Sequence, residues 1–590
     1  MTETPLPATA RNGGANGADA PPAALDNGHP RKWLILWAVS LGMFMALLDV
    51  TIVNIAMPAI QEDFGVSWAT ASWVLNAYNL AMAALFLTMG RVADKFGQKL
   101  VFTTGLAVFT VFSLLCGLAP SINWLIAARF GQGVGGAMMM PVSLSILMGA
   151  FPKRQHGTAV GIWGALGTAA AALGPSIGGI LVTYVNWHWI FFINVPIGIA
   201  AFIFAMIVVP ERKRADAAGT VDIGGILLSA GGLFCLVLAL TQGNDWGWTS
   251  WRTLLLFGIA FVCFPLFYWW ETRIKHPMFD FRLLRIRSFT AANTAIMAMG
   301  TAMGASMLLL VIFMVNVMGY TELKAALAMT FMPFTALFVA PVAGRLNDRI
   351  GPRYLSAAGL SLFGIGLVLL AQLGAEASLP SVAWRLVIMG FGMGLSMPSL
   401  AAAAMGSLPP QFGGVGAGAF STLRQIGLVL GVAVSISIFT HTVANEVQTA
   451  ATKAVGYVAV QAEIPPQAKI QIIDGLKKTA ALAAHGGSEA GQRLGGSQAQ
   501  MPAPPAGPPD QVAQIEAQQK SLQDKIGTFF KDQIAHAFTW PFYAAALAAF
   551  LGVIPALFTG RRLGEHEGHE KMDREERATA MAGTEQGVTA

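Results

Sequence analysis

The sequence predicts an all-α polytopic membrane protein of fourteen spanning helices, built from a duplicated six-helix unit with two further helices inserted between the copies. Three observations predict this fold. Of the 590 residues, 55% are hydrophobic and 12% charged, whereas about 25% are charged in a soluble domain. Apolar windows of about 18 or more residues recur, and each can cross a hydrocarbon core of about 30 Å as a helix. The octapeptide GRVADKFG at residues 90–97 returns as GRLNDRIG at residues 344–351.

The predicted spans follow the apolar windows and end at the polar or glycine-rich segments between them. They cover residues 33–57, 70–90, 99–119, 122–150, 158–184 and 190–209, then 223–242 and 252–271, then 288–318, 325–345, 353–373, 381–407, 413–440 and 537–559. Residues 1–32, rich in Ala, Gly, Pro and Asn, lack a signal-peptide pattern and predict a disordered tail. Residues 561–590 form a second polar tail.

The repeated octapeptide determines the domain organisation. A charged, glycine-bounded segment cannot sit in hydrocarbon, so each copy is expected to be a tight turn between two spans on a wet face of the bilayer. The copies follow spans 2 and 10, a shift of eight helices, whereas a duplicated six-helix unit would shift by six. The sequence therefore predicts an N-terminal bundle at 33–210, an inserted pair with its linkers at 211–287, and a second bundle from 288–440 and 537–560.

Loops that contain Lys and Arg alternate with loops nearly free of them. The basic set comprises Arg31 and Lys32, Lys95, Lys153 and Arg154, Arg212 to Arg214, Arg273 to Arg287, Arg349, and Arg561 and Arg562. By the positive-inside rule these loops and both termini are cytoplasmic. The same dispersal explains the net charge of +6 without a nucleic-acid partner, because the basic residues collect on no single polar domain.

One outer segment, residues 441–536, is far longer than the others. It contains two helix-like stretches around the low-complexity sequence MPAPPAGPPD at 501–510. Asp510 is suited to cap the second stretch, whose apolar face comprises Val512, Ile515, Leu522, Ile526 and Phe529. Either the segment is a solvated hairpin that extends the two flanking spans, or it is a lid or docking surface, since long ordered loops are often functional.

Asp49, in the outer part of the first span, is the one carboxylate found well inside a predicted span. An ionised Asp there costs about 2.5–3.5 kcal/mol on insertion scales, so it needs a partner, water or a proton. Burial favours the protonated carboxyl, which would let Asp49 exchange protons. Arg129 is the candidate partner, because a rise of about 1.5 Å per residue places both side chains at similar depths. The alternative is a fixed ion pair that only holds helices together. Asn54, in the same span, is a candidate cavity residue.

Small residues and a proline mark the fifth span at ALGPSIGG, residues 172–179. Gly174, Gly178 and Gly179 allow a close helix contact, and Pro175 removes a backbone hydrogen bond and bends the helix. Packing alone would explain the pattern. The alternative is a hinge surface between the two halves, which would let a central site open to either face.

In the repeated segment, Asp94 can accept hydrogen bonds from backbone N–H groups at the start of the third span, and Lys95 can bridge to a neighbouring segment. That arrangement would hold the cytoplasmic face shut. A solvated turn explains one copy of the segment but not the recurrence of the same residue types in the same order. The shared positions are Gly90, Asp94, Lys95 and Gly97 in the first copy and Gly344, Asp348, Arg349 and Gly351 in the second.

Six stretches together carry a resemblance to one family: LDVTIVNIAMP, GRVADKFGQK, LIAARFGQGVGG, LGPSIGG, WHWIFFINVPIG and RQIGLVLGVA. Over about residues 33–440 and 537–560 the chain resembles the fourteen-spanner drug:proton antiporters of the major facilitator superfamily, the EmrB/QacA type. The resemblance implies the major facilitator fold, with Asp49 as the proton-linked carboxylate and Arg129 as its charge partner. It also implies that Asp94 is a loop latch and that Gly174 and Pro175 form the antiport hinge.

The resemblance further implies efflux of amphipathic small molecules across a bacterial cytoplasmic membrane, driven by the proton gradient without a cofactor, with an extracytoplasmic adaptor as an optional partner. Gln98 departs from the basic residue usual in the loop motif, and Ala170 from the usual Gly of the hinge motif. Spans 9 to 14 hold no deep acidic residue, which disfavours dicationic substrates. Arg385, Arg424 and Gln425 leave neutral or anionic substrates open.

Two other functions are alternatives to drug export. The chain could be a dedicated exporter of one endogenous lipid, siderophore or antibiotic, with residues 441–536 as a delivery surface. A membrane enzyme or sensor is disfavoured, because the sequence shows no nucleophile–base pair, phosphate loop or metal cluster in a plausible site. The three cysteines and the tail residues His566 and His569 do not predict a metal site.

Overall fold

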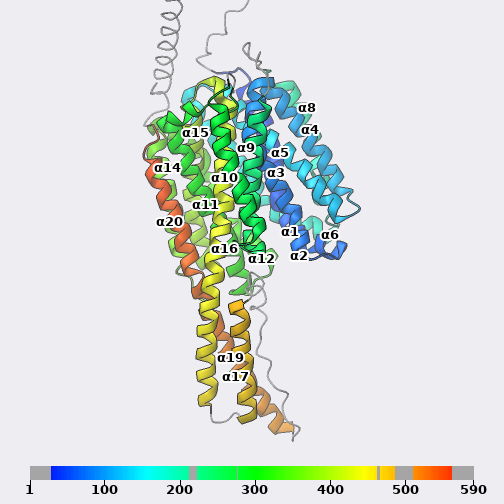
Figure 1. Ribbon diagram of the computed structural model, residues 1–590, viewed down its shortest axis with the longest axis vertical. Helices are drawn as coiled ribbons and strands as arrows, with labels where there is room; N and C mark the ends of the chain where they lie inside the picture. Colours follow the sequence, from blue (N-terminus) through cyan, green and yellow to red (C-terminus); the bar gives the residue numbers. More distant parts are fainter. Residues whose placement is uncertain (1–27, 212–221, 275–276, 462–465, 486–508, 561–590) are drawn as a thin grey trace, which may run out of the picture.

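The computed structural model describes residues 28–211, 222–274, 277–461, 466–485 and 509–560. Within these ranges the protein is helical without strands, and fourteen helices are long and apolar enough to cross a membrane (Figure 1). The predicted all-α polytopic fold and its number of spans are confirmed. Residues 1–27 of the tail predicted at 1–32, and the tail predicted at 561–590 with His566 and His569, lie outside the described residues.

The first six spans agree with the predicted windows apart from their ends. They are α1 (Lys32–Phe64), α2 (Trp68–Ala71) with α3 (Trp73–Phe96), α4 (Gln98–Gly117), α5 (Ile122–Ala150), η1 (Lys153–Gln155) with α6 (His156–Tyr184), and α7 (Trp189–Phe192) with α8 (Asn194–Val208). The two further spans are α9 (Ile223–Trp246) and α10 (Trp251–Glu271).

The remaining spans follow a short 3-10 helix, η2 (Phe281–Arg285). They are α11 (Arg287–Asn316), α12 (Glu322–Met329) with α13 (Phe331–Ile350), α14 (Pro352–Leu370), α15 (Leu379–Gly406), α16 (Gly413–Val460) after η3 (Pro410–Phe412), and α20 (Thr539–Ala556), which α19 (Pro509–Ala537) precedes. One more helix, α17 (Pro466–His485), lies between α16 and α19.

Local sequence explains many helix ends. Ser67, Ser121 and Ser250 each accept a hydrogen bond from the backbone N–H three residues later, which satisfies a donor that has no partner within the helix. Gly97 and Gly351 are single-residue turns with φ of +109° and +85°, a conformation that favours glycine. The repeated octapeptide is therefore not a loop as predicted. It is the end of a helix plus one glycine, because nothing before that glycine breaks the helical hydrogen bonds.

Contacts across the bundle join distant parts of the sequence. α3 packs along α16, and α6 packs along α13. The inserted helix α9 contacts α10, α3 and α16, whereas α10 packs mainly on α9 and exposes most of its surface. The residue boundaries of the two bundles and of the inserted segment stay predictions.

The segment predicted as a long outer loop is largely helical. α16 contains 48 residues and continues to Val460, beyond the predicted end at 440, because apolar residues at helical spacing are buried along its extension. That stripe packs on Ile472 and Leu476 of α17 and on Leu522 and Ile526 of α19. We call residues 441–460, α17 and α19 the hairpin (Figure 1). The side chains of Asp510, Val512 and Ile515 lie outside the described part of the chain.

The hairpin lies at one end of the bundle, and the start of α1 and the end of α20 lie at the other (Figure 1). We call the end with α17 and α19 the hairpin end. We call the other end, where α3 turns into α4 and α13 into α14, the loop end.

Candidate functional site

Asp49 lies near the midpoint of α1, and its side chain is 0% exposed. The prediction placed it in the outer part of a span that ended at residue 57. That position was wrong because α1 continues through Pro58 to Phe64. A midpoint position surrounds the carboxylate with the apolar interior of the bundle.

Three side chains donate hydrogen bonds to the Asp49 carboxylate. Nη1 of Arg129 lies 2.5 Å from Oδ2, while Nε2 of Gln132 and Nδ2 of Asn194 lie 2.9 Å and 3.0 Å from Oδ1. The donors come from α5 and α8, which carry polar residues that face α1. Together they stabilise the ionised carboxylate, since hydrogen bonds to a charged acceptor are stronger than neutral ones.

Arg129 is equally buried and makes further contacts. Its Nε donates to the carbonyl of Val74 at 3.0 Å, and Nη1 also donates to Oε1 of Gln132 at 2.7 Å. The guanidinium carbon lies 4.2 Å from the centre of the Tyr78 ring. Nη2 has no hydrogen-bond partner among the described residues. Such a buried pair depends on both members, because removing one leaves an uncompensated charge.

Sequence reasoning missed four members of this cluster: Tyr78, Ser113, Gln132 and Asn194. Ser113 receives a hydrogen bond from Asn194 at 3.2 Å, and it donates to the carbonyl of Phe191 at 2.9 Å. Gln132 could have been found because it lies one helical turn after Arg129 on the same face. Asn194 is the single amide in the apolar run FFINVPIG. All the side chains of the cluster come from α1, α3, α4, α5 and α8.

At the loop end, Asp94 of α3 contacts the start of α16. Its carboxylate oxygens accept hydrogen bonds from the backbone N–H groups of Gly414 and Val415, both at 2.8 Å. These N–H groups belong to the first turn of α16 and have no partner within that helix. The positive end of the helix dipole also favours a carboxylate there.

The second copy of the repeat makes the corresponding contact with α6. Asp348 of α13 accepts hydrogen bonds from the N–H groups of Gly157 and Thr158 at 2.7 Å and 2.9 Å, and from the Thr158 hydroxyl. Each copy of the repeat therefore holds the first turn of a helix that is distant in sequence. We call the two contacts the Asp–helix latches.

Pairs of glycines bring the helices close enough for these latches. A Cβ added at Gly90 would overlap the carbonyl oxygen of Gly414, and one at Gly344 would overlap that of Gly157. The contacts are reciprocal, because a Cβ at Gly414 or Gly157 would strike its partner in turn. Glycine at the first position of the repeat is thus required by a close backbone approach.

The structure corrects the expected partner of Asp94. The prediction assigned it to the start of the third span, now α4, but Asp94 lies within the last turn of α3. A cap of the following helix must have non-helical backbone just before that helix, so Asp94 cannot take that role. Lys95 lies 5.8 Å from the Phe96 ring centre, and Arg349 is exposed at the corresponding position.

The glycines of the hinge motif lie against α1 rather than between the halves. A Cβ at Gly174 would overlap the Thr51 side chain, and one at Gly178 would lie 3.3 Å from the carbonyl oxygen of Ile52. Pro175 is buried between them. Gly179 is the one glycine of this motif that faces α12: a Cβ added there would lie 3.2 Å from the Leu323 side chain. The expected hinge surface between the halves is therefore mainly a contact between α6 and α1.

The remaining candidate polar residues share no hydrogen bond or ion pair with the side chains of the Asp49 cluster that the structure describes. Asn54 is exposed and donates to the carbonyl of Val50 in its own helix at 3.1 Å. Gln425 is buried on the face of α16 that approaches α3, two turns after Gly418. Arg424 is half-buried in the middle of the bundle. Arg385 is satisfied by the carbonyls of Leu369 and Ser381.

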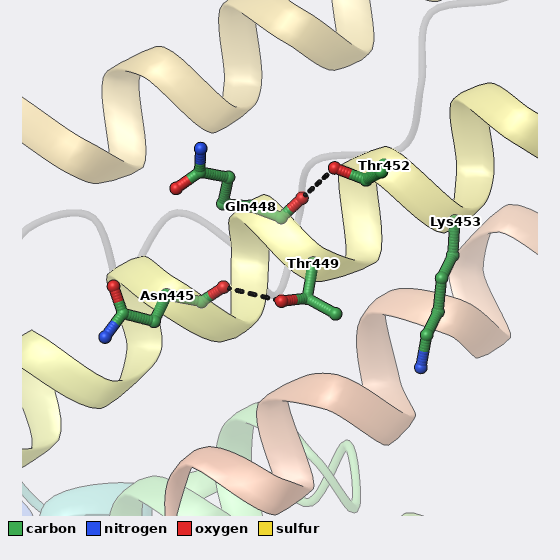
Figure 2. Close-up of a pocket in the computed structure, with 5 residues that line it drawn as sticks. All are labelled: Asn445, Gln448, Thr449, Thr452 and Lys453. Atoms are coloured by element: carbon green, nitrogen blue, oxygen red, sulfur yellow. Dashed lines mark hydrogen bonds between the residues drawn. The ribbon is translucent and has the colours of Figure 1, made fainter.

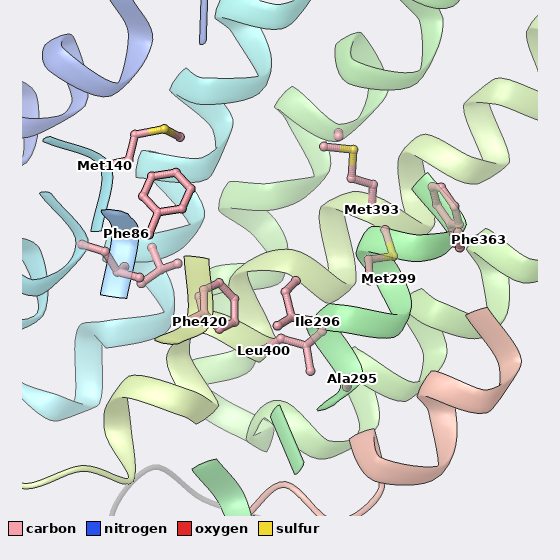
Figure 3. Close-up of a cluster of buried hydrophobic side chains, with 14 of the residues drawn as sticks. Phe86, Met140, Ala295, Ile296, Met299, Phe363, Met393, Leu400 and Phe420 are labelled. Carbon is pink, nitrogen blue, oxygen red and sulfur yellow. The ribbon is translucent and has the colours of Figure 1, made fainter. Parts of the chain in front are cut away.

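Methionine and phenylalanine side chains fill the space between the helices. Figure 3 shows Met140, Met299 and Met393 among the packed side chains of this apolar cluster, and all three are at least 93% buried. These methionines belong to the packed core in the described state. Their flexible thioethers suit a surface that can repack around different ligands.

A polar pocket lies on the part of α16 that belongs to the hairpin (Figure 2). Its lining residues are Asn445, Gln448, Thr449, Thr452 and Lys453. The two threonine hydroxyls donate to carbonyls of the same helix at 3.0 Å and 2.8 Å. No group of three or more His, Cys, Asp or Glu residues suited to a metal ion is found in the described ranges. The buried cluster at Asp49 is therefore the candidate functional site.

Comparison with known proteins identifies the family. The model of the Major Facilitator Superfamily matches residues 39–432. The chain belongs to this superfamily. This major facilitator protein is 33% identical over 406 residues to the tetracenomycin C resistance and export protein of Streptomyces glaucescens, covering 68% of this chain and 75% of that protein. It is 35% identical over 404 residues to the multidrug resistance protein Stp of Mycobacterium tuberculosis (strain CDC 1551 / Oshkosh), covering 68% and 74%.

A solved structure shares the major facilitator fold. The human organic anion transporter MFSD10 superimposes with a TM-score of 0.54 at 15% identity, covering 70% of this chain and 94% of that chain. The protein is thus a multi-pass membrane transporter and not an enzyme.

Proposed function

We propose that this transporter exports amphipathic small molecules in exchange for protons, with Asp49 as the proton-linked group. The observation that carries the proposal is the Asp49–Arg129 pair, which is fully buried near the midpoint of a spanning helix. Ionisable residues in such positions are costly and commonly mark ion or proton pathways. Export is supported by the names of the relatives, which describe tetracenomycin C export and multidrug resistance. The proton gradient would drive transport without a cofactor.

Protonation of Asp49 would change the energetics of the whole cluster. A neutral carboxyl no longer balances Arg129, and its hydrogen bonds from Gln132 and Asn194 weaken. Because Asp49 is fully buried, a proton can reach it only after neighbouring helices move. Proton binding would thereby be tied to a change between alternate states, as alternating access requires.

A contiguous packed path links this cluster to the loop end. Thr51, two residues after Asp49, packs on Gly174 of α6, and the first turn of the same helix forms the latch with Asp348. A shift of α1 would therefore move α6 and strain the latch. The midplane cavity would lie between the two six-helix halves, with the inserted pair outside them.

The proposed orientation places the loop end in the cytoplasm of a bacterial cell, because the basic loops would then face inward. Both termini would be cytoplasmic and the hairpin extracytoplasmic. In that orientation the described state is closed toward the cytoplasm, with both Asp–helix latches formed.

The test replaces Asp49 with Asn in full-length protein reconstituted in liposomes that contain a pH-sensitive dye. Wild type is expected to release protons when members of an amphipathic panel, including tetracenomycin C, are added. Asp49→Asn is expected to reduce this release to the level of protein-free liposomes, because the amide cannot carry the proton.

Glu62→Gln serves as the matched control, since Glu62 is an exposed carboxylate on the same helix. Its proton release is expected to equal that of wild type. Unchanged release by Asp49→Asn would exclude Asp49 as the coupling group. Transport by wild type without any proton movement would exclude antiport altogether.

A second candidate function is export of one endogenous compound, with the hairpin as a delivery surface or adaptor site. The ordered hairpin favours this candidate, as does a relative named for a single compound, tetracenomycin C. Tyr457 of α16 and Phe529 of α19 contact each other with ring centres 5.7 Å apart, so a deletion of residues 456–526 joins two helices that lie side by side.

Deletion of residues 456–526 is expected to leave transport of the whole panel intact if the protein is a broad exporter. Transport rates for each compound, measured beside those of the full chain, check this expectation. Loss confined to one compound would instead support the dedicated exporter. Loss for all compounds with normal folding would assign the hairpin a mechanical or adaptor role.

A further inference from the structure

Arg424 is a charged residue in the spanning part of α16 that the proton-coupling cluster does not use. It lies about 16 Å along the helix axis from Gly413, at 1.5 Å per residue, and so falls within the middle of the bundle. Arg129, the fully buried arginine of the Asp49 cluster, has Asp49, Gln132 and Val74 as partners. Arg424 has no such hydrogen-bonding or charged partner among the residues that the structure describes.

Within the described ranges, the guanidinium of Arg424 makes no hydrogen bond and no ion pair. The two salt bridges among those residues are Arg129–Asp49 and Arg282–Asp280. Its side chain is half-buried, so only part of it can be hydrated. An unpaired charge in the interior of a membrane protein is costly. An anion bound beside Arg424 would supply the counter-charge that no described residue provides.

The position of Arg424 on its helix directs it toward the interior. Helical spacing puts it on one face with Ser421 and Ser435, both buried. Its backbone carbonyl lies close to Gly300 of α11. The residue therefore lies where α16 packs on α11, in the interior of the bundle.

An apolar wall lies next to this charge. Phe420, one turn before Arg424, belongs to the cluster that contains Phe86 of α3 and Met140 of α5 (Figure 3). Aromatic rings and methionines bind flat apolar groups, and methionine can repack to suit different shapes. One cation beside such a wall is complementary to a molecule with an apolar body and one negative group.

We propose that Arg424 binds the anionic group, a carboxylate or ionised hydroxyl, of an amphipathic substrate whose apolar body packs against Phe420, Phe86 and Met140. The proposal rests on the proposed export function and assigns its substrate class. A guanidinium recognises a carboxylate with two parallel N–H donors, which gives both affinity and orientation. Asp49 and Arg129 stay paired with each other, so the site for the anion and the site for the proton are separate.

The test measures equilibrium binding to purified full-length protein in neutral detergent, without a proton gradient. Three probes share one skeleton: pyrene-1-butyrate, pyrene-1-butyramide and a pyrene-alkyl trimethylammonium. Wild type is expected to bind the butyrate more tightly than the other two. Arg424→Gln is expected to weaken butyrate binding by about tenfold or more, as loss of hydrogen bonds to a charged group predicts. Binding of the neutral amide is expected to change by less than about twofold.

Two variants control this result. Arg424→Lys keeps the charge and is expected to restore part of the preference for the butyrate. Arg252→Gln removes the same charge from an exposed position on α10 and is expected to leave all three affinities unchanged. The melting temperature of Arg424→Gln is expected to equal or exceed that of wild type, since an unpaired interior charge is removed.

Equal loss of butyrate and amide binding, or a lower melting temperature, would show a structural role and overturn the proposal. A phosphate of an anionic lipid offers the same chemistry, so binding is repeated in nanodiscs with and without phosphatidylglycerol. Displacement of the butyrate by that lipid would assign Arg424 to the headgroup and overturn the proposal. Butyrate binding through Arg424 without proton-coupled transport would retain the anion site and reject the export mechanism. Transport of the amide without butyrate binding would retain the export mechanism and reject the anion site.

Discussion

Replacing Arg129 with Leu is expected to destabilise the protein by about 3–5 kcal/mol, because the Asp49 carboxylate stays buried without its counter-charge. Gln132 and Asn194 can still donate to the carboxylate, but neither supplies a positive charge. Leucine retains apolar volume beside Tyr78, so the loss reports mainly on electrostatics. Thermal unfolding of the purified protein in detergent measures the effect.

Two further variants separate the effect of the unpaired buried charge from the other effects of losing an arginine. Arg252→Leu removes an exposed arginine and is expected to change stability by less than about 0.5 kcal/mol. The double variant Asp49→Asn/Arg129→Leu is expected to recover much of the loss, since no unpaired charge is left. An Arg129→Leu protein as stable as Arg252→Leu would show that the buried pair does not support the fold.

Removing both latch carboxylates, by Asp94→Ala together with Asp348→Ala, is expected to open the loop end. The change deletes five hydrogen bonds to charged acceptors at the first turns of α16 and α6. If each latch contributes about 1.5–3 kcal/mol, the closed state loses at least about a hundredfold in population relative to the open state. Either single variant is expected to have a smaller effect.

Spin labels at Leu100→Cys and Tyr354→Cys measure this opening. These exposed positions lie on α4 and α14, just beyond the two single-glycine turns, and the three native cysteines are replaced by Ala. The inter-label distance is expected to lengthen in the double variant. Glu376→Ala removes one carboxylate from an exposed turn; it controls for the loss of a negative charge and is expected to retain the wild-type distances. Wild-type distances in the double variant would contradict the latch.

The sequence predicted the number of spans because a long apolar window is sufficient for a membrane-spanning helix. The sequence predicted the ends of α1 and α16 less well. α1 continues through Pro58 to Phe64 and α16 to Val460, because packing within the protein stabilises turns that hydropathy treats as loop. The sequence predicted two helix-like stretches in the hairpin. It did not predict that these helices pack on an extension of α16.

Parts of the candidate site were likewise visible in advance. Asp49 and Arg129 stood out because each is a lone charge in an apolar helix, and a charge in hydrocarbon demands a partner. Gln132 and Asn194 did not stand out, since a neutral amide costs much less to bury and can serve many purposes. The partner of Asp94 was misassigned for a different reason, namely that local capping rules consider only neighbours in sequence.

By itself, the sequence determined the all-α membrane fold, the duplicated octapeptide and the charges that must be neutralised inside it. These features follow from composition and periodicity, which act locally along the chain. Only the tertiary structure decided which groups meet: Asp94 contacts Gly414, 320 residues away, and Asp348 contacts Gly157, 191 residues away. Those pairings depend on how whole helices pack, and glycine pairs that permit a close backbone approach can be recognised only once the helices lie side by side.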